Sequence, residues 1–174
     1  MSYCLQTLKG ITLDCQPSMG GIKTVYLANF DDVKGVTLDA SSEKISGFTM
    51  ADGVKFKTYQ FRKNTGSMNS TLTADDTSGL NYVTTEVSLV FTKMETAKRI
   101  EMTALAQAQL AVIVEDSNGI YWYTTMDEYA SASTGTGETG TAKGDRNAYT
   151  LTLKSENKTY PFEVDAAAIV SITE

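Results

Sequence analysis

Apolar and polar residues alternate along most of the chain, and clusters of Gly, Asn, Asp and Ser interrupt the alternation. A period of two broken in this way is typical of β-strands joined by turns. The clearest strand has its apolar residues on one parity: Val83, Val87, Leu89 and Phe91. Its other parity is polar, which predicts a strand with one solvated face.

Two further segments, residues 23–30 and 54–61, carry shorter apolar runs and are predicted to be strands. In the second of them the apolar parity changes between Phe56 and Tyr59. A change of parity predicts either a β-bulge or a strand that turns from one face of the sheet to the other.

Residues 110–123 read LAVIVEDSNGIYWY, in which an apolar run and an aromatic run flank an Asn-Gly turn. This arrangement predicts a β-hairpin, because Asn and Gly tolerate positive φ. Alternate members of the aromatic run must enter the core, so either Trp122 or the pair Tyr121 and Tyr123 packs inside. Residues 149–153 and 160–164 alternate again, and we expect them to form a second hairpin.

One helix is predicted, over residues 93–107. Thr92 and Glu95 have the spacing of a capping box, and an apolar stripe recurs at helical intervals: Ala97, Ile100, Ala104 and Ala108. We expect this stripe to pack on the sheet. The predicted fold class is therefore mainly β, a sandwich or barrel with one packed α-helix and a long extended hairpin loop.

The predicted hairpin loop is the polar stretch of residues 62–82, which is too long for a tight turn. We expect either a protruding hairpin or a disordered loop. Residues 1–21 precede the first strand as an N-terminal arm. No linker divides the rest, so residues 1–174 are predicted to form a single β domain.

Composition narrows the range of functions. A net charge of −6 and a pI near 4.7 disfavour binding to phosphate backbones by charge. The chain has no histidine, which excludes Ser-His-Asp and Cys-His catalytic sites. Cys4 and Cys15 are too few for a disulfide framework, and we interpret them as free thiols, with a disulfide closing the arm as the alternative.

The sequence shows no evident targeting signal. The first nine residues lack the pattern of a signal peptide, and no apolar run reaches the length of a membrane span. We therefore expect a protein made in the cytoplasm, with no membrane partner and no cofactor.

Two kinds of motif in the sequence could indicate an enzyme or a ligand site. Residues 135–140 spell G-x-G-x-x-G, but neither a buried strand before them nor a helix after them is predicted. A flexible surface loop is therefore expected over residues 130–144, which are rich in Ser, Thr and Gly. Paired acids occur at three places: Asp31-Asp32, Asp75-Asp76 and Asp127-Glu128. Adjacent acids in polar turns are typical of solvated loops, although calcium binding at Asp75-Asp76 or Asp145 stays open. We expect no catalytic residue and no enzyme.

The order of these elements, together with residues 110–123 and the stretch TGETGTAKGDRNAYTLTLKSENKTYPFEV at 136–164, resembles the tail-tube (major tail) proteins of tailed bacteriophages and the related tubes of contractile injection machines. The resemblance implies a virion structural protein, assembled in the bacterial host cytoplasm. It implies a homo-oligomer whose hexameric rings stack around a lumen that conducts DNA without binding it specifically. Other tail proteins of the virion would be its partners.

Under this resemblance, residues 62–82 act as a stacking loop and residues 1–21 dock on an adjacent subunit. The interface residues expected in the loop are Asn64, Gly66, Met68, Leu72, Asp75, Asp76, Leu80 and Tyr82, and those expected in the arm are Tyr3, Leu5 and Leu8. Acidic residues on one strand parity would line the lumen.

Two alternatives remain. Within the structural class, the chain would be a neck or tail-completion ring protein or a capsid decoration protein. In a different class, it would be a carbohydrate-binding β-sandwich module, with Trp122 as the sugar platform.

Overall fold

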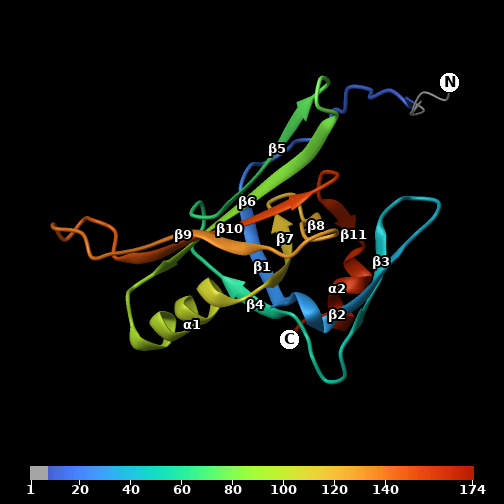
Figure 1. Ribbon diagram of the computed structural model, residues 1–174. Coiled ribbons are helices and arrows are strands. Elements are labelled where there is room, and N and C mark those ends of the chain that lie inside the picture. The colour runs from blue at the N-terminus through green and yellow to red at the C-terminus, as the bar shows by residue number, and fades with distance from the viewer. Residues whose placement is uncertain (1–7) are drawn as a thin grey trace.

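The computed structural model describes residues 8–174, which form two β-sheets and two α-helices (Figure 1). The elements in chain order are β1 (Ile22–Asn29), a 3₁₀ turn (Phe30–Asp32), β2 (Val33–Leu38), β3 (Ile45–Met50), β4 (Lys57–Gln60), β5 (Ser67–Asp75), β6 (Leu80–Thr92), α1 (Thr96–Gln107), β7 (Leu110–Asp116), β8 (Tyr121–Tyr123), β9 (Ser131–Glu138), β10 (Ala148–Asn157), β11 (Phe162–Val164) and α2 (Ala166–Ile172). The fold is mainly β, as the alternating pattern predicted.

The two sheets differ in size and connection. The larger has seven strands in the order β2-β3-β11-β8-β7-β1-β4, and the smaller has four in the order β5-β6-β10-β9. The smaller sheet is antiparallel throughout, whereas β11 pairs with β3 in parallel. The outermost strands of the smaller sheet, β5 and β9, lie on opposite sides of its central pair, β6 and β10.

The first hydrophobic core lies between the two sheets. The seven-stranded sheet contributes Val25 and Leu27 from β1, and the four-stranded sheet contributes Leu89, Leu151 and Leu153. All five side chains are at most 2% exposed. Because alternate residues of each strand enter this core, the period-two pattern was visible in the sequence.

A second core covers the other face of the seven-stranded sheet. It includes Phe56, Ile113 and Tyr123, and α2 closes it with Ile169 and Ile172. Strand β7 therefore has both faces covered, which explains why residues 110–114 are continuously apolar rather than alternating.

The parity change in residues 54–61 is a change of face. Phe56 is buried in the second core, whereas Tyr59 and Phe61 pack against the first. The predicted hairpin of residues 110–123 is also present: β7 pairs with β8, and Gly119 has φ of 81° in the turn. Of the two packing alternatives for the aromatic run, the tyrosines are the pair that faces the second core.

The second predicted hairpin is wrong. Strand β10 belongs to the four-stranded sheet, whereas β11 pairs with β8 and β3 in the other sheet. The end of β10 is fixed to the main chain before β9, since Ser155 Oγ and Asn157 Nδ2 donate to the Thr124 carbonyl at 2.8 and 2.7 Å. Alternation located both strands, but it carries no information about their partners.

Helix α1 differs from its prediction in two respects. It begins at Thr96 without a capping box, because Lys93 takes a φ of 67° and Glu95 instead bonds the Lys98 ammonium at 2.8 Å. Three members of the expected apolar stripe, Ala97, Ile100 and Ala104, are exposed, Ile100 to 57%. The helix packs on the first core through Leu105 and Met102, and the fourth member, Ala108, packs there just after it. Helix α2 was not predicted at all.

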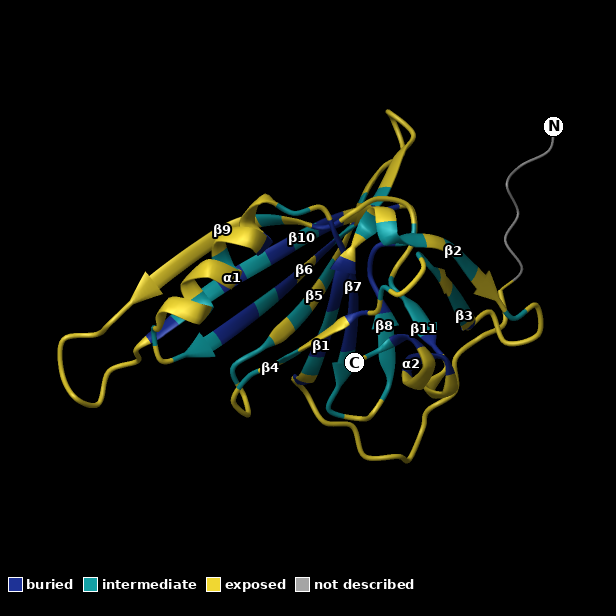
Figure 2. Cartoon of the chain, turned by 90° about the horizontal axis from the view of Figure 1, so that it is seen from below, coloured by how far each residue is buried: buried dark blue, intermediate teal, exposed yellow. Residues whose placement is uncertain are grey.

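The segment expected to be a flexible loop at residues 130–144 contains a strand. Residues 131–138 form β9, which pairs with β10 along its length apart from a bulge near Ser133. Small side chains permit this pairing at close range: a Cβ on Gly137 would lie 2.9 Å from the Tyr149 ring. The low apolar content of β9 hid it, because both of its faces are largely exposed (Figure 2).

Candidate assembly surface

The polar stretch at residues 62–82 is a projecting hairpin, not a disordered loop. Strand β5 pairs with β6 without interruption from Ser67 opposite Ser88 to Asp75 opposite Leu80. At the tip, the Asp75 carboxylate accepts bonds from Ser78 Oγ at 2.8 Å and from the Thr77 N–H at 2.9 Å, and these bonds lower the pKa of Asp75. The hairpin extends beyond the body of the molecule (Figure 1).

The residues expected to form an interface in this hairpin divide into two groups. Gly66 and Met68 pack inward, against Phe61 and the first core. Leu72 and Leu80, near the tip, are 47% and 46% exposed.

Three of the remaining loop residues are exposed, and one is partly buried. Asn64 sits in a left-handed turn with φ of 63°, Asp75 serves the tip turn, and Asp76 lies in the same turn. Tyr82 is half-buried on β6. The tip leucines, Asn64, Asp75 and Asp76 are thus the members of the predicted hairpin set that a second molecule can reach, and their role in an interface stays a prediction.

The described part of the N-terminal arm, residues 8–21, is exposed and meets the rest of the molecule at two places. One is an exposed ion pair between Lys9 and Glu43 at 3.4 Å, and the other lies at its C-terminal end. The Met19 N–H donates to Asn118 Oδ1 at 2.8 Å, and the Ser117 N–H donates to the Gly21 carbonyl at 3.0 Å. These bonds hold the arm to the turn between β7 and β8. Cys15 is an exposed free thiol, whereas Cys4 lies outside the described residues.

Before that anchor, three large apolar side chains of the arm are in solvent. Leu8 is 92%, Ile11 102% and Leu13 96% exposed. Leu8 was among the predicted interface residues, and Tyr3 and Leu5 lie outside the described residues. Ile11 and Leu13 were not nominated from the sequence, although an apolar pair two residues apart in a polar arm was a visible signal.

The four-stranded sheet ends in two long edges. Strand β5 has nine residues and β9 has eight, and neither contains Lys, Arg or Pro. Edge strands usually carry such residues, which discourage pairing with another chain. The edges of the seven-stranded sheet, β2 and β4, each contain a lysine.

The face of the four-stranded sheet opposite the first core is polar. Its central cross-strand pairs are Thr84 with Glu156, Glu86 with Lys154 and Ser88 with Thr152, and we call these six residues the polar face. Lys154 and Glu156 form an ion pair at 2.7 Å, and the bond to Glu156 raises the pKa of Lys154. Hydroxyl groups and two acidic side chains against one basic side chain make the face weakly acidic.

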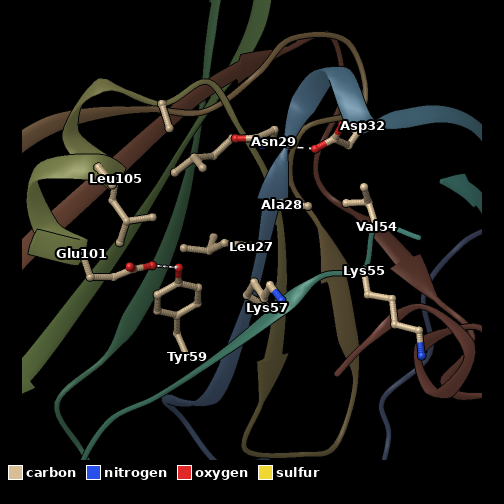
Figure 3. Close-up of a pocket in the computed structure, with 13 residues that line it drawn as sticks. Leu27, Ala28, Asn29, Asp32, Val54, Lys55, Lys57, Tyr59, Glu101 and Leu105 are labelled. Carbon is tan, nitrogen blue, oxygen red and sulfur yellow. Dashed lines mark hydrogen bonds between the residues drawn. The ribbon is translucent and has the colours of Figure 1, made fainter. Parts of the chain in front are cut away.

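A groove runs between α1 and strands β1 and β4 (Figure 3). Its volume is about 200 Å³, and we call it the α1 groove. Its apolar lining comes from both the sheet and α1, and its charged lining has both signs: Leu27, Ala28, Ala104 and Leu105 are apolar, and Lys55, Lys57, Asp32 and Glu101 are charged. An apolar lining flanked by charged groups fits an apolar side chain carried on a polypeptide.

The Tyr59 phenol closes one end of the α1 groove by donating to the Glu101 carboxylate (Figure 3). Burial and this bond raise the pKa of Tyr59 well above its usual range. On the far side of the bond lies a second hollow of about 210 Å³, lined by Gln60, Phe91 and Met102 among others. The residues of β4 thus border two hollows beneath one helix.

The glycine motif of residues 135–140 does not form a nucleotide-binding turn. Gly135 and Gly137 lie within β9, Gly140 turns with φ of 70°, and β10 follows rather than a helix. This arrangement is not the strand-turn-helix that a dinucleotide-binding motif requires. Asp145 accepts from the N–H groups of Thr141 and Ala142, so its carboxylate closes the same turn.

Within residues 8–174, no three His, Cys, Asp or Glu side chains gather closely enough to hold a metal ion. Nor does any helix of the same range combine the length and apolar character needed to cross a bilayer.

Trp122, the residue considered as a sugar platform, is half-buried. Its Nε1 donates to Asp116 Oδ2 at 3.1 Å, and the ring borders a hollow shared with Met19 and Met68. The tryptophan therefore connects the anchor of the arm with the base of the hairpin.

Comparison with protein families, with curated proteins and with solved structures found no match.

Proposed function

We propose that this chain is a structural subunit of a bacteriophage tail tube, which joins copies of itself into hexameric rings and stacks the rings around a lumen. The observation that carries the proposal is the pair of long edges without Lys, Arg or Pro on opposite sides of the four-stranded sheet. The proposal also draws on the resemblance in element order described above.

Edge pairing would supply the contact within a ring. When β9 of one copy pairs with β5 of the next, the N–H and C=O groups of both edges become bonded and the small sheet continues across the boundary. The two edges are different surfaces, so the contact is head-to-tail. A head-to-tail contact repeats around a ring when its rotation closes.

Contacts between rings would come from the hairpin tip and the arm. Leu72 and Leu80 at the tip, and Leu8, Ile11 and Leu13 in the arm, are exposed apolar side chains on segments that extend from the body. Their burial against a neighbour would stabilise the stack, since removal of apolar surface from water drives most protein association.

The polar face would then line the lumen. A sheet that continues around the ring turns one face toward the axis, and the first core occupies the other face. A weakly acidic, hydroxyl-rich wall repels phosphates and lets DNA pass without adhering.

Electron microscopy of the concentrated protein tests this function. Long cylinders with a central channel are the expected particles, and analytical ultracentrifugation should show species far larger than a monomer. Single rings without stacking would favour the neck or tail-completion role. A protein that stays monomeric at millimolar concentration would contradict self-assembly altogether.

Paired proline variants in β9 test the edge contact. In an edge strand, neighbouring N–H groups point alternately to the partner strand and to solvent. Of the variants Thr134→Pro and Gly135→Pro, one therefore removes an N–H that bonds β10, and the other removes an N–H that points outward. We expect one variant to unfold at lower temperature and the other to keep its midpoint while losing ring formation. If the variant that keeps its midpoint still forms rings, β9 is not the lateral contact.

A further inference from the structure

The side chain of Asn118 holds the arm to the body of the molecule. Its Oδ1 accepts the Met19 N–H at 2.8 Å, and its Nδ2 donates to the Met19 carbonyl at 3.2 Å and to Ser18 Oγ at 3.5 Å. The amide thus pairs with both main-chain groups of one residue, as a neighbouring strand would. The Met19 side chain borders the same hollow as Met68 and Trp122. One amide group therefore positions the C-terminal end of the arm.

Few other contacts hold the arm before residue 20. Among the described residues, its other polar contact with the body is the Lys9–Glu43 ion pair, whose side chains are 80% and 79% exposed. Ion pairs exposed to this degree contribute little. The bonds from Ser117 to the Gly21 carbonyl fix the chain only from residue 21 onward. Attachment of the rest of the arm therefore depends mainly on the Asn118 amide.

Asn118 is also the one asparagine of the chain that precedes a glycine. The main-chain nitrogen of Gly119 can attack Asn118 Cγ, because glycine has no Cβ to obstruct the approach. A bond forms between this nitrogen and Cγ, the Cγ–Nδ2 bond breaks, and ammonia leaves with the proton of the Gly119 N–H. Water then opens the succinimide ring to give either aspartate or isoaspartate. The net reaction consumes one water and releases one ammonia, without an enzyme or an oxidant.

The turn between β7 and β8 exposes these two residues to solvent but restrains them. Asn118 and Gly119 are both exposed, so water and base reach them. With the arm attached, however, the Asn118 amide faces Met19, and the Gly119 N–H donates to the Asp116 carbonyl at 3.2 Å. Attack requires the amide to leave Met19 and turn toward the Gly119 nitrogen. The reaction rate therefore scales with the fraction of molecules in which the arm is detached.

We propose that Asn118 is a site of spontaneous deamidation, and that isoaspartate formed there releases the arm. Isoaspartate routes the main chain through Cγ, so neither half of the pairing with Met19 survives. Aspartate, the other product, keeps an acceptor for the Met19 N–H and loses only the donor to the Met19 carbonyl. The reaction needs a single copy of the chain, so it does not depend on the tube function.

Peptide mapping by mass spectrometry tests the reaction. The full chain is incubated at mildly alkaline pH, digested, and examined for the gain in mass that accompanies conversion of an amide to an acid. Asn118 should convert before any other asparagine. Conversion of other asparagines while Asn118 stays intact would overturn the proposal.

Two proline variants in the arm test whether the arm restrains Asn118. Met19→Pro removes the N–H that Asn118 accepts, so conversion should become about 2- to 10-fold faster, as expected for the loss of one hydrogen bond. Leu13→Pro is the matched control, because Leu13 lies in the same arm and is 96% exposed, and it should convert at the wild-type rate. Equal rates in the two variants would overturn the link between the arm and the reaction.

Fluorescence anisotropy tests the release of the arm. In a Cys4→Ser background, a dye on the exposed thiol of Cys15 reports how freely the arm rotates. The isoaspartate form is separated by chromatography from the unconverted chain of the same incubated sample. It should show the lower anisotropy of the two, and equal anisotropy would overturn the release.

Asn118→Asp controls for the added charge. The variant carries the same negative charge as isoaspartate without the rearranged main chain. Freshly prepared, it should lower the anisotropy less than isoaspartate does, because the Met19 N–H keeps its acceptor. An equal decrease would assign the release to charge and would overturn the role of isoaspartate.

Discussion

Gly66, just before β5, occupies a position with no room for a side chain. A Cβ there would lie 2.5 Å from the Phe61 ring and 2.8 Å from Ile22 Cγ1. Gly66→Ala must therefore displace core atoms, and overpacking of this kind costs about 1–3 kcal/mol of the free energy of unfolding. Urea denaturation measures the loss. Gly47→Ala, in β3 with no atom within 4 Å of the added Cβ, should change stability far less.

Ionisation of Tyr26 should make the stability of the folded state depend on pH in the alkaline range. Burial, and next the negative charge of Glu115, raise the pKa of Tyr26 from 10.0 to about 12. The folded state therefore favours the neutral phenol more than the unfolded state does. Its contribution to stability is fully present below pH 10 and is lost as the pH rises toward 12.

Tyr26→Phe should remove this dependence. Thermal unfolding midpoints of the wild type and the variant, measured from pH 9 to pH 12, should show the wild type losing its advantage as the pH rises. A constant difference between the two proteins over that range would mean that ionisation of Tyr26 is not coupled to folding. Tyr160→Phe, at an exposed tyrosine, controls for general effects of the substitution.

At this scale, the sequence predicted some site residues and not others. Leu72 and Leu80 are exposed near the tip as an interface would require, whereas Met68, from the same polar stretch, packs on the first core. Sequence alone does not show which residues of a polar hairpin return to the body, because that depends on where the hairpin leaves it. Ile11 and Leu13 were not predicted, although they are an apolar pair in a polar part of the arm.

Among the elements, the β5–β6 hairpin allows a test of the proposed contact between rings. Leu72→Lys and Leu80→Lys place charges on a half-exposed tip and should leave the unfolding midpoint nearly unchanged. If the tip is buried between rings, each lost leucine contact costs about 1.5–3 kcal/mol, which raises the concentration needed for stacking at least about tenfold. Sedimentation against concentration measures this shift.

The matched control is Leu38→Lys on β2, because Leu38 is 43% exposed, close to the 47% and 46% of the tip leucines. It should assemble at the wild-type concentration. Equal assembly by the tip variants and the control would show that the tip is not a contact between rings.

The sequence predicted most strands but not their arrangement. Strands that bury one face, such as β6, have a period of two that is independent of their partners. By contrast, β9 buries almost nothing, and α2 is only seven residues long, so neither has a pattern to detect. The helix was located correctly, but its stripe of Ala97, Ile100 and Ala104 is exposed, since the sheet meets the side that carries Leu105.

At the scale of the whole molecule, the charge of the polar face would determine whether an assembled tube binds DNA. Glu86→Lys and Glu156→Lys together should leave the tube intact and reverse the sign of its wall. Duplex DNA should then bind to the tubes with an affinity that falls steeply as salt rises. Electrophoretic mobility shift of assembled tubes at increasing salt concentrations measures this effect.

A variant with the same change in net charge controls for charge elsewhere. Glu43→Lys and Asp52→Lys lie in exposed loops of the other sheet, on either side of β3. If these tubes hold DNA as strongly as the first variant, the polar face does not line the channel.

The two ends of the four-stranded sheet are different surfaces, β5 on one side and β9 on the other, so a row of copies joined through them has a direction. An open row would present β5 at one terminus and β9 at the other, and each terminus would accept a new copy through a different strand. Only closure of the row into a ring would leave neither strand exposed.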